Sequence, residues 1–84
     1  MNRDDVYRIL NSFSHKATLK VDIQHNLSKA TQHTIPAYDS TEGWSEKDQK
    51  RRHQIEDATE EILFVKSILI KPSSGNIINI EIQC

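Results

Sequence analysis

Residues 44–84 read WSEKDQKRRHQIEDATEEILFVKSILIKPSSGNIINIEIQC and decide the fold of this chain. In the first half, Ile55, Ala58, Ile62 and Val65 recur at intervals of three and four residues. This is the spacing of one face of a helix. The second half is rich in isoleucine at alternate positions, which is typical of β-strands with one buried face. The stretch therefore predicts a long helix followed by a pair of strands.

The predicted helix starts with the capping-box pattern SEKD at residues 45–48, directly after Trp44. We expect Leu63 and Phe64 to widen its apolar face near the end. Upstream of Ile55, the helix has no apolar residue for nearly three turns. Those first turns are therefore expected to leave the core and to face solvent or a partner.

The strand pair is predicted as a β-hairpin. Residues 68–70 alternate into Pro72, residues 73–76 have turn composition, and residues 77–83 alternate again. We expect the isoleucines of the last strand to lie in the core. The alternative is that residues 77–83 lie at a sheet edge, where they would pair with a second subunit or with a partner's sheet.

The first part of the chain predicts one helix and one strand. Apolar residues from Val6 to Phe13 form a helical stripe, with Asn2 as its cap. Residues 17–24 alternate between apolar and polar, as in a half-buried strand. Residues 25–43 are open to two interpretations. Either ATQHTI at 30–35 is a return strand, or the whole segment is a polar loop; in both cases PAYDSTEG at 36–43 is a loop.

These elements predict an α+β fold with the order α-β-(β)-α-β-β. We expect a small two-layer sandwich, in which two helices pack on one face of an antiparallel sheet of three to four strands. Residues 1–84 form a single domain in this prediction. A chain this short buries a small core, so a homo-oligomer, most simply a dimer, is expected to add stability.

Composition limits the classes of function. The chain has a net charge of −1, with 11 basic and 12 acidic residues. This charge argues against non-specific nucleic-acid binding, which needs a basic domain, and against mimicry of DNA, which needs a strongly acidic one. Its one cysteine, Cys84, cannot form an intramolecular disulfide. With no signal-peptide pattern in residues 1–10 and no long apolar run, we expect a soluble cytoplasmic protein.

A basic cluster opens the predicted helix and provides most of the candidate site residues. Its members are Lys47, Lys50, Arg51, Arg52 and His53. Cations at a helix start oppose the helix dipole, although Asp48 and Arg52 form a favourable i,i+4 pair. Three interpretations stay open: a solvated helix face, a surface for a protein partner or a second subunit, or a site for phosphate or RNA.

Two aromatic residues, Tyr38 and Trp44, stand on either side of the acidic loop that precedes the helix. Aromatic residues at such positions commonly cover the core. The alternative is that they anchor a partner, because tyrosine and tryptophan dominate binding hot spots. Either ring could also stack on a nucleobase.

Metal and catalytic signatures are absent from the sequence. The four histidines lack the short spacings of zinc ligands, and His53 with the acidic residues at 56, 57 and 60 comes from one helix only. We therefore expect no metal and no cofactor. A small ribonuclease is the weaker alternative, with His25, His33 or His53 as general base and Arg51 or Lys50 on the phosphate.

The sequence thus predicts a small non-enzymatic binding module that occludes or sequesters a partner. The predicted binding region is the helix surface of residues 44–61 and the preceding loop. This size and mixed charge are typical of inhibitor, immunity or anti-defence proteins of bacteria and their phages. The alternative function is binding of a nucleic acid or a nucleotide-type ligand through the basic helix start.

Overall fold

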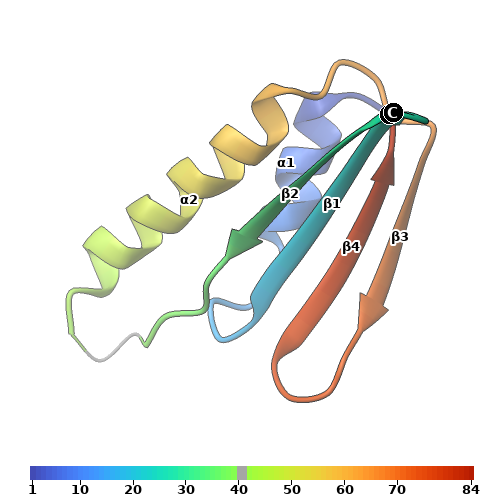
Figure 1. Cartoon of the computed structure of the whole chain (residues 1–84). Coiled ribbons are helices and arrows are strands. Elements are labelled where there is room, and N and C mark those ends of the chain that lie inside the picture. The colour runs from blue at the N-terminus through green and yellow to red at the C-terminus, as the bar shows by residue number, and fades with distance from the viewer. Residues whose placement is uncertain (40–41) are drawn as a thin grey trace.

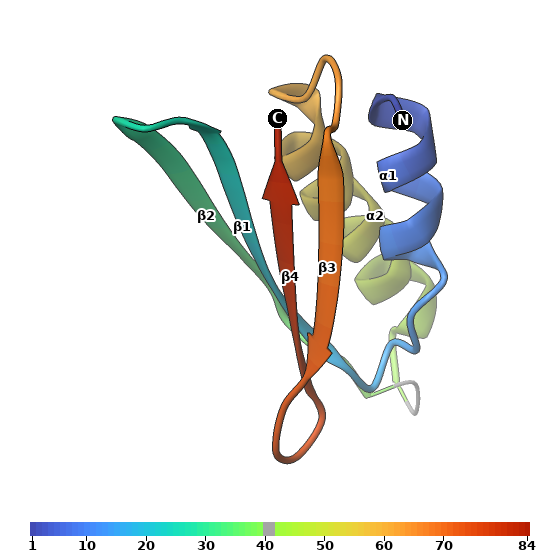
Figure 2. The same ribbon diagram turned by 90° about the vertical axis from the view of Figure 1, so that its right-hand side faces the viewer.

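The computed structural model describes residues 1–39 and 42–84. Over these residues, the chain forms the elements α1 (Arg3–Asn11), β1 (Thr18–Asn26), β2 (Lys29–Ile35), α2 (Trp44–Glu60), β3 (Ser67–Pro72) and β4 (Ile77–Gln83). Figure 1 shows the four strands as one sheet. Both helices lie on the same side of it (Figure 2). The predicted α+β fold and its element order are confirmed, and the return strand is present as β2.

The sheet has the strand order β2-β1-β4-β3 and is mixed. β2 and β3 pair antiparallel with their neighbours, whereas β1 and β4 pair in parallel, with Val21 opposite Ile80. The prediction of a wholly antiparallel sheet is therefore wrong for the central pair. Alternating hydrophobicity reports which face of a strand is buried, but not the direction of its neighbour. The chain between β1 and β4 includes α2, which is long enough for a parallel crossover.

β4 lies between β1 and β3, so the alternative that residues 77–83 form a sheet edge is wrong. The apolar face of β4 explains its inner position, because Ile80 and Ile82 are fully covered by the core. Within the described sheet, the two edges are β2 and β3.

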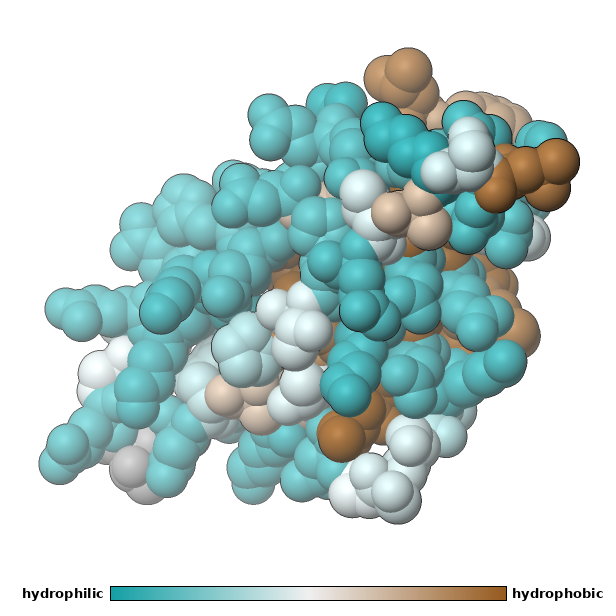
Figure 3. All heavy atoms as spheres, in the orientation of Figure 1, coloured by the Kyte–Doolittle hydropathy of each residue, from teal (hydrophilic) through white to brown (hydrophobic). Residues whose placement is uncertain are grey.

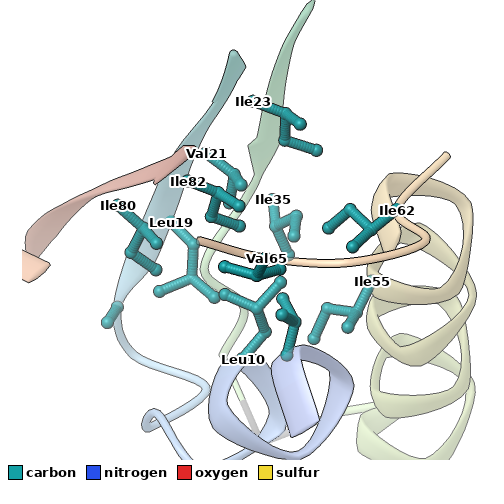
Figure 4. Close-up of a cluster of buried hydrophobic side chains, with 12 residues drawn as sticks. Leu10, Leu19, Val21, Ile23, Ile35, Ile55, Ile62, Val65, Ile80 and Ile82 are labelled. Atoms are coloured by element: carbon teal, nitrogen blue, oxygen red, sulfur yellow. The ribbon is translucent and has the colours of Figure 1, made fainter. Parts of the chain in front are cut away.

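The core fills the space between the sheet and the two helices (Figure 4). Each inner strand contributes alternate residues, as the period of two requires. The cluster consists of Val6, Leu10, Ala17, Leu19, Val21, Ile23, Ile35, Ile55, Ile62, Val65, Ile80 and Ile82. The predicted core positions of the long helix and the last strand are thus largely confirmed.

α1 has the cap that its sequence predicts. The side-chain oxygen of Asn2 accepts a hydrogen bond of 3.1 Å from the backbone N–H of Asp5. The carboxylate of Asp5 in turn accepts one of 3.0 Å from the backbone N–H of Asn2. This reciprocal capping box satisfies two N–H groups that the helix start would otherwise leave free.

α2 starts differently from its prediction. The helix begins at Trp44, after Gly43 in the left-handed region at φ 61°, so Ser45 already lies in the first turn. At the described start of α2, no side chain makes a capping hydrogen bond. The predicted capping box at residues 45–48 is therefore wrong. The cap is Gly43, two residues before Ser45, in a conformation that glycine adopts without strain.

α2 also ends earlier than its apolar stripe suggests. The helix stops at Glu60, and Ile62 and Val65 reach the core from the following segment. Leu63 and Phe64 are 82% and 63% exposed, so the prediction that they widen the apolar face is wrong. The segment runs beside the N-terminus instead, where the N–H of Val65 donates to the carbonyl of Met1 at 2.9 Å.

An arginine from α1 completes the end of α2. Arg3 donates from Nη2 to the carbonyl of Glu60 at 2.8 Å and from Nε to the carbonyl of Ile62 at 3.1 Å. The last turn of α2 contains no basic residue of its own. Arg3 therefore places a cation at the negative end of the helix dipole and binds carbonyls that the helix leaves free.

In the described part of the chain, none of the helices has the length and apolar character needed to cross a membrane.

Candidate functional site

Arg51 is buried within the fold, unlike the other members of the basic cluster. Its side chain donates from Nη1 to the carbonyls of Ala17 and Pro36, both at 2.9 Å, and from Nη2 to the carbonyl of Ser14 at 3.1 Å. Only 5% of the residue is exposed. Burial lowers the pKa of its guanidinium, while Tyr38 and the Asp48 carboxylate raise it. An arginine nevertheless keeps its charge in this setting.

Arg51 thus joins the loop between α1 and β1 to the segment that leaves β2. The expectation that the turns of α2 before Ile55 leave the core and face solvent or a partner is wrong at this residue. A planar guanidinium can donate in several directions at once, which a lysine cannot do. Because its hydrogen bonds go to backbone carbonyls, Arg51 is an anchor of the fold, and we omit it from the candidate binding residues.

Tyr38 lies directly beside this anchor and is held from three sides. Its backbone N–H donates to the carbonyl of His15 at 2.9 Å, and the two rings lie 4.8 Å apart between centroids, tilted by 32°. Its hydroxyl donates to Asp48 at 3.0 Å. Desolvation and the hydrogen bond to Asp48 raise the pKa of Tyr38 above 10.0, so the hydroxyl remains a donor.

Asp48 connects Tyr38 to the next basic residue. Its second carboxylate oxygen lies 3.1 Å from Nε of Arg52, which confirms the predicted i,i+4 pair. The Arg52 side chain remains 64% exposed. It therefore presents its remaining N–H groups to solvent from a position fixed by Asp48.

Three neighbouring surface depressions share Tyr38 as a wall, with volumes of about 440, 340 and 470 Å³. Each is bordered by at least one exposed cation. Arg52 borders the first, Lys47 and Lys50 border the second, and Lys16 borders the third. We call Lys16, Tyr38, Lys47, Lys50 and Arg52 the Tyr38 surface. It combines one fixed aromatic ring with four basic side chains.

The other two predicted residues, Trp44 and His53, line none of these three depressions. Trp44 is 59% exposed at the first position of α2, so the interpretation that it covers the core is wrong. It lies one turn before Lys47 on the same side of the helix. The exposed His53 ring lies 3.5 Å from the Glu56 carboxylate. In Figure 3, the surface over α2 is predominantly hydrophilic, as the sequence of these turns predicts.

A second polar cluster, at the far end of α2, was not among the predicted sites. Glu61 lies 3.1 Å from Nε2 of His25 and 3.5 Å from Nε2 of His33, and it accepts a hydrogen bond from the Thr31 hydroxyl. Burial raises the pKa of the Glu61 carboxyl, but the Thr31 and His25 hydrogen bonds and the nearby His33 outweigh it. The net result is a pKa below the ordinary 4.5.

The strand pattern contained a signal for this cluster. His25 continues the buried alternation of Leu19, Val21 and Ile23 along β1, so its side chain falls on the helix-facing side. On β2, the residues opposite Val21 and Ile23 are His33 and Thr31. Polar residues in line with a core face need polar partners. The sequence does not show that Glu61 provides this partner, because it comes from another part of the chain.

The chemistry available to this second cluster is limited. Among residues 1–39 and 42–84, no group of three or more histidine, cysteine or acidic side chains is arranged to hold a metal ion. His25 and His33 contact Glu61, which lies ten residues along the chain from Arg51. At 1.5 Å per residue, this corresponds to roughly 15 Å along a helix. This spacing does not favour His25 or His33 as the base beside Arg51, and the ribonuclease alternative with His53 stays a prediction.

Comparisons of the chain with protein-family models, with curated proteins and with solved structures found no match.

Proposed function

We propose that this protein is a small non-enzymatic binding module that occludes or sequesters a protein partner. The partner docks on the Tyr38 surface and on the exposed ring of Trp44. One observation carries the proposal: a tyrosine held by Asp48 and His15 borders three depressions that four basic side chains help to line, and Arg51 anchors the chain next to it. A surface that is already ordered loses little conformational entropy on binding.

The chemistry of the surface favours an acidic partner. Lys16, Lys47, Lys50 and Arg52 provide positive charge, which would speed association with an acidic surface and select against a basic one. Tyr38 and Trp44 provide the flat, rigid rings that dominate binding hot spots. A single free cysteine fits activity in the reducing cytoplasm, so we extend the proposal to that compartment.

The second candidate function is binding of a nucleic acid or a nucleotide-type ligand at the same surface. The observation in its favour is the His15–Tyr38 ring pair with cations on several sides. Such a pair could extend onto a base while the cations contact phosphates. The net charge of −1 argues for the protein partner over this candidate.

The experiment compares three immobilised proteins as baits in a lysate of the source cells. These are the wild type, the double variant Trp44→Ala/Lys50→Glu and the control Leu27→Ser. Leu27 is fully exposed in the β1–β2 turn, away from the Tyr38 surface. We expect wild type and control to retain the same protein, which is then purified and titrated against all three baits. A reduction in affinity of at least tenfold, confined to the double variant, would support the proposal.

Two results would contradict the protein-binding proposal. One is a partner that binds all three baits equally. The other is the absence of any specific partner together with tight binding of a fluorescent single-stranded RNA of about 12 nucleotides. RNA binding through phosphates should weaken steeply as salt increases, and the double variant should reduce this salt dependence. That outcome would establish the second candidate in place of the first.

A further inference from the structure

β3 is an open sheet edge that carries apolar side chains on both of its faces. It pairs with β4 on one side and ends the sheet on the other (Figure 2). Leu69 is 49% exposed and Ile70 is 40% exposed, although neighbouring residues of one strand point to opposite faces. An edge with exposed apolar residues on both faces is a template for pairing with another strand.

The hydrogen-bond pattern identifies which backbone groups are available. The N–H of Ser73 donates to the carbonyl of Ile77 at 2.9 Å, and the register continues without a shift to Leu69 opposite Glu81. Because antiparallel pairs alternate, the odd-numbered residues of β3 bond to β4. The N–H and C=O groups of Ile68 and Ile70 therefore face the open edge.

Pro72 is the next even-numbered residue of β3, so its backbone also faces the open edge, but it has no N–H to donate. A proline in a sheet is tolerated where its nitrogen faces an open edge. Its position agrees with the assignment of hydrogen bonds along β3. It also limits the length of edge that a neighbouring strand can use, because the ladder must end before Pro72.

We propose that a second copy of this chain pairs antiparallel with β3, around a two-fold axis at Leu69. This arrangement places Ile68 opposite Ile70 of the other copy and Leu69 opposite its own counterpart. Both outward-facing isoleucines then form complete pairs, which gives four backbone hydrogen bonds across the interface. The two sheets join into one continuous sheet. This inference goes beyond the proposed function, because β3 contributes no residue to the Tyr38 surface.

The charges along this edge are compatible with self-pairing. Around the same axis, Lys71 faces Ser67 of the other copy, so like charges do not oppose each other at these positions. The Lys71 ammonium lies 3.5 Å from Glu81 of its own chain, which reduces repulsion further. On the other sheet edge, β2 presents Thr31 and His33 toward Glu61, and α2 packs beside it. β3 is therefore the edge suited to a second copy.

The proposal predicts a dimer of moderate affinity. A six-residue edge buries less surface than the roughly 800 Å² per partner of a standard interface. Light scattering at increasing concentration should therefore show the mass rising from 9.7 kDa to twice that value. The Leu69→Lys variant should remain at the monomer mass, because it places two cations opposite each other.

A cysteine at position 69 tests the proposed axis directly. In a Cys84→Ala background, Leu69→Cys should form a disulfide-linked dimer under mild oxidation. The reason is that Leu69 and its counterpart form a non-hydrogen-bonded pair in the proposed ladder. The Cα atoms of such a pair lie about 4.5 Å apart, within the range of a disulfide. Leu27→Cys in the same background reports random collision, since its position is also exposed.

Faster cross-linking at position 69 than at position 27, together with loss of the dimer in Leu69→Lys, would support the proposal. Equal cross-linking rates would overturn it, as would a wild-type chain that remains monomeric up to roughly millimolar concentration, where even weak complexes form. A dimer that persists in Leu69→Lys would also overturn it, because it must use another surface. None of these outcomes bears on the Tyr38 surface, which is tested separately.

Discussion

The first half and the end of α2 are attached to the rest of the fold by polar contacts of opposite kinds. In its first half, α2 donates hydrogen bonds, because Arg51, the eighth of its 17 residues, binds three carbonyls of neighbouring segments. At its end, the chain accepts them, because Arg3 binds the last carbonyls and Glu61 accepts from Thr31 and contacts two histidines. A helix with few apolar residues is thus held in place by one apolar stripe and a polar contact at each end.

This comparison explains a charge distribution that seemed unfavourable in the sequence. Cations near the start and carboxylates near the end oppose the dipole of α2. In the fold, the cation of Arg51 and the carboxylate of Glu61 both interact with groups outside the helix. Tertiary contacts, and not a binding function, therefore account for part of the charge that opposes the dipole of α2. The cations that α2 contributes to the Tyr38 surface are exposed, so burial in the fold does not explain them.

The two ends also differ in how they respond to pH. Arg51 and its carbonyl partners do not titrate in the ordinary range. Glu61 does, with a pKa below the ordinary 4.5. The Arg51 contacts of the first half of α2 should therefore persist under all ordinary conditions, whereas the Glu61 contacts at its end should weaken in acid. The following predictions test this difference, beginning with the largest effect.

The largest effect is expected from Arg51→Met. The variant keeps a long apolar side chain but leaves three carbonyls without their donor, one of them buried. We expect the free energy of unfolding to fall by about 3 kcal/mol, as measured by urea denaturation. Arg51→Lys should recover only part of this loss, because an ammonium cannot reach all three carbonyls in the same geometry.

Arg52→Met is the matched control for this prediction. Arg52 is the next residue along the helix, but its pair with Asp48 is exposed, so its loss should cost less than about 0.5 kcal/mol. If both variants lost the same amount of stability, Arg51 would not be the anchor that its hydrogen bonds indicate. The first half of α2 would then have to be attached by apolar contacts alone.

Arg51 also shows what the sequence can and cannot reveal. The residue lies four positions before Ile55, so it continues the core stripe of Ile55 and Ala58 by one turn. Helical spacing could therefore have separated it from Arg52 and predicted that it is buried. The sequence does not identify its partners, because the three carbonyls belong to the backbone and carry no side-chain signature.

The same limit applies elsewhere in the fold. Periodicity predicted both helices, the strands β1, β3 and β4 and most of the core, because burial of one face imposes it directly. It left β2 as one of two alternatives, because residues 30–35 have no clearly apolar face. Strand direction and the partner of Glu61 depend on how distant segments meet, for which local patterns contain no information. The end of α2 after Glu60 was also missed. Its apolar residues continue at helical spacing, although only Ile62 and Val65 enter the core.

The second prediction concerns the acid-sensitive end of α2. Because the pKa of Glu61 in the folded chain is lower than the ordinary 4.5, its ionised form stabilises the fold above that pH. This stabilisation is lost as the pH falls through the lowered pKa. We expect Glu61→Gln to cost about 1–2 kcal/mol at neutral pH, since it removes charge-assisted hydrogen bonds.

The difference between wild type and Glu61→Gln should become smaller as the pH falls below the ordinary pKa of 4.5. Urea denaturation across this range measures it, with Glu60→Gln as the control at an exposed neighbouring position. A difference that stays constant down to pH 3 would mean that the Glu61 charge does not contribute to attaching the end of α2. The contrast in pH response between the two ends would then be wrong.

The smallest effect is expected at the first turn of α2. Here Ser45→Ala should cost little stability, whereas Gly43→Ala should cost more. Ser45→Ala should change the free energy of unfolding by less than about 0.3 kcal/mol. Alanine is a good helix former, and the serine lies inside the first turn and not at the cap. Gly43→Ala should cost about 1 kcal/mol, since alanine does not readily adopt φ 61°.

The glycine effect is one of backbone conformation alone, because a Cβ atom at Gly43 would have no neighbouring atom within 4 Å. Thermal unfolding of both variants separates the two accounts of how α2 begins. A serine that caps the helix should cost roughly 1 kcal/mol when replaced by alanine. If Ser45→Ala lost that much and Gly43→Ala lost nothing, the helix would start at the capping box. Arg51 would then lie two residues nearer to the start of the helix than it does when Gly43 is the cap.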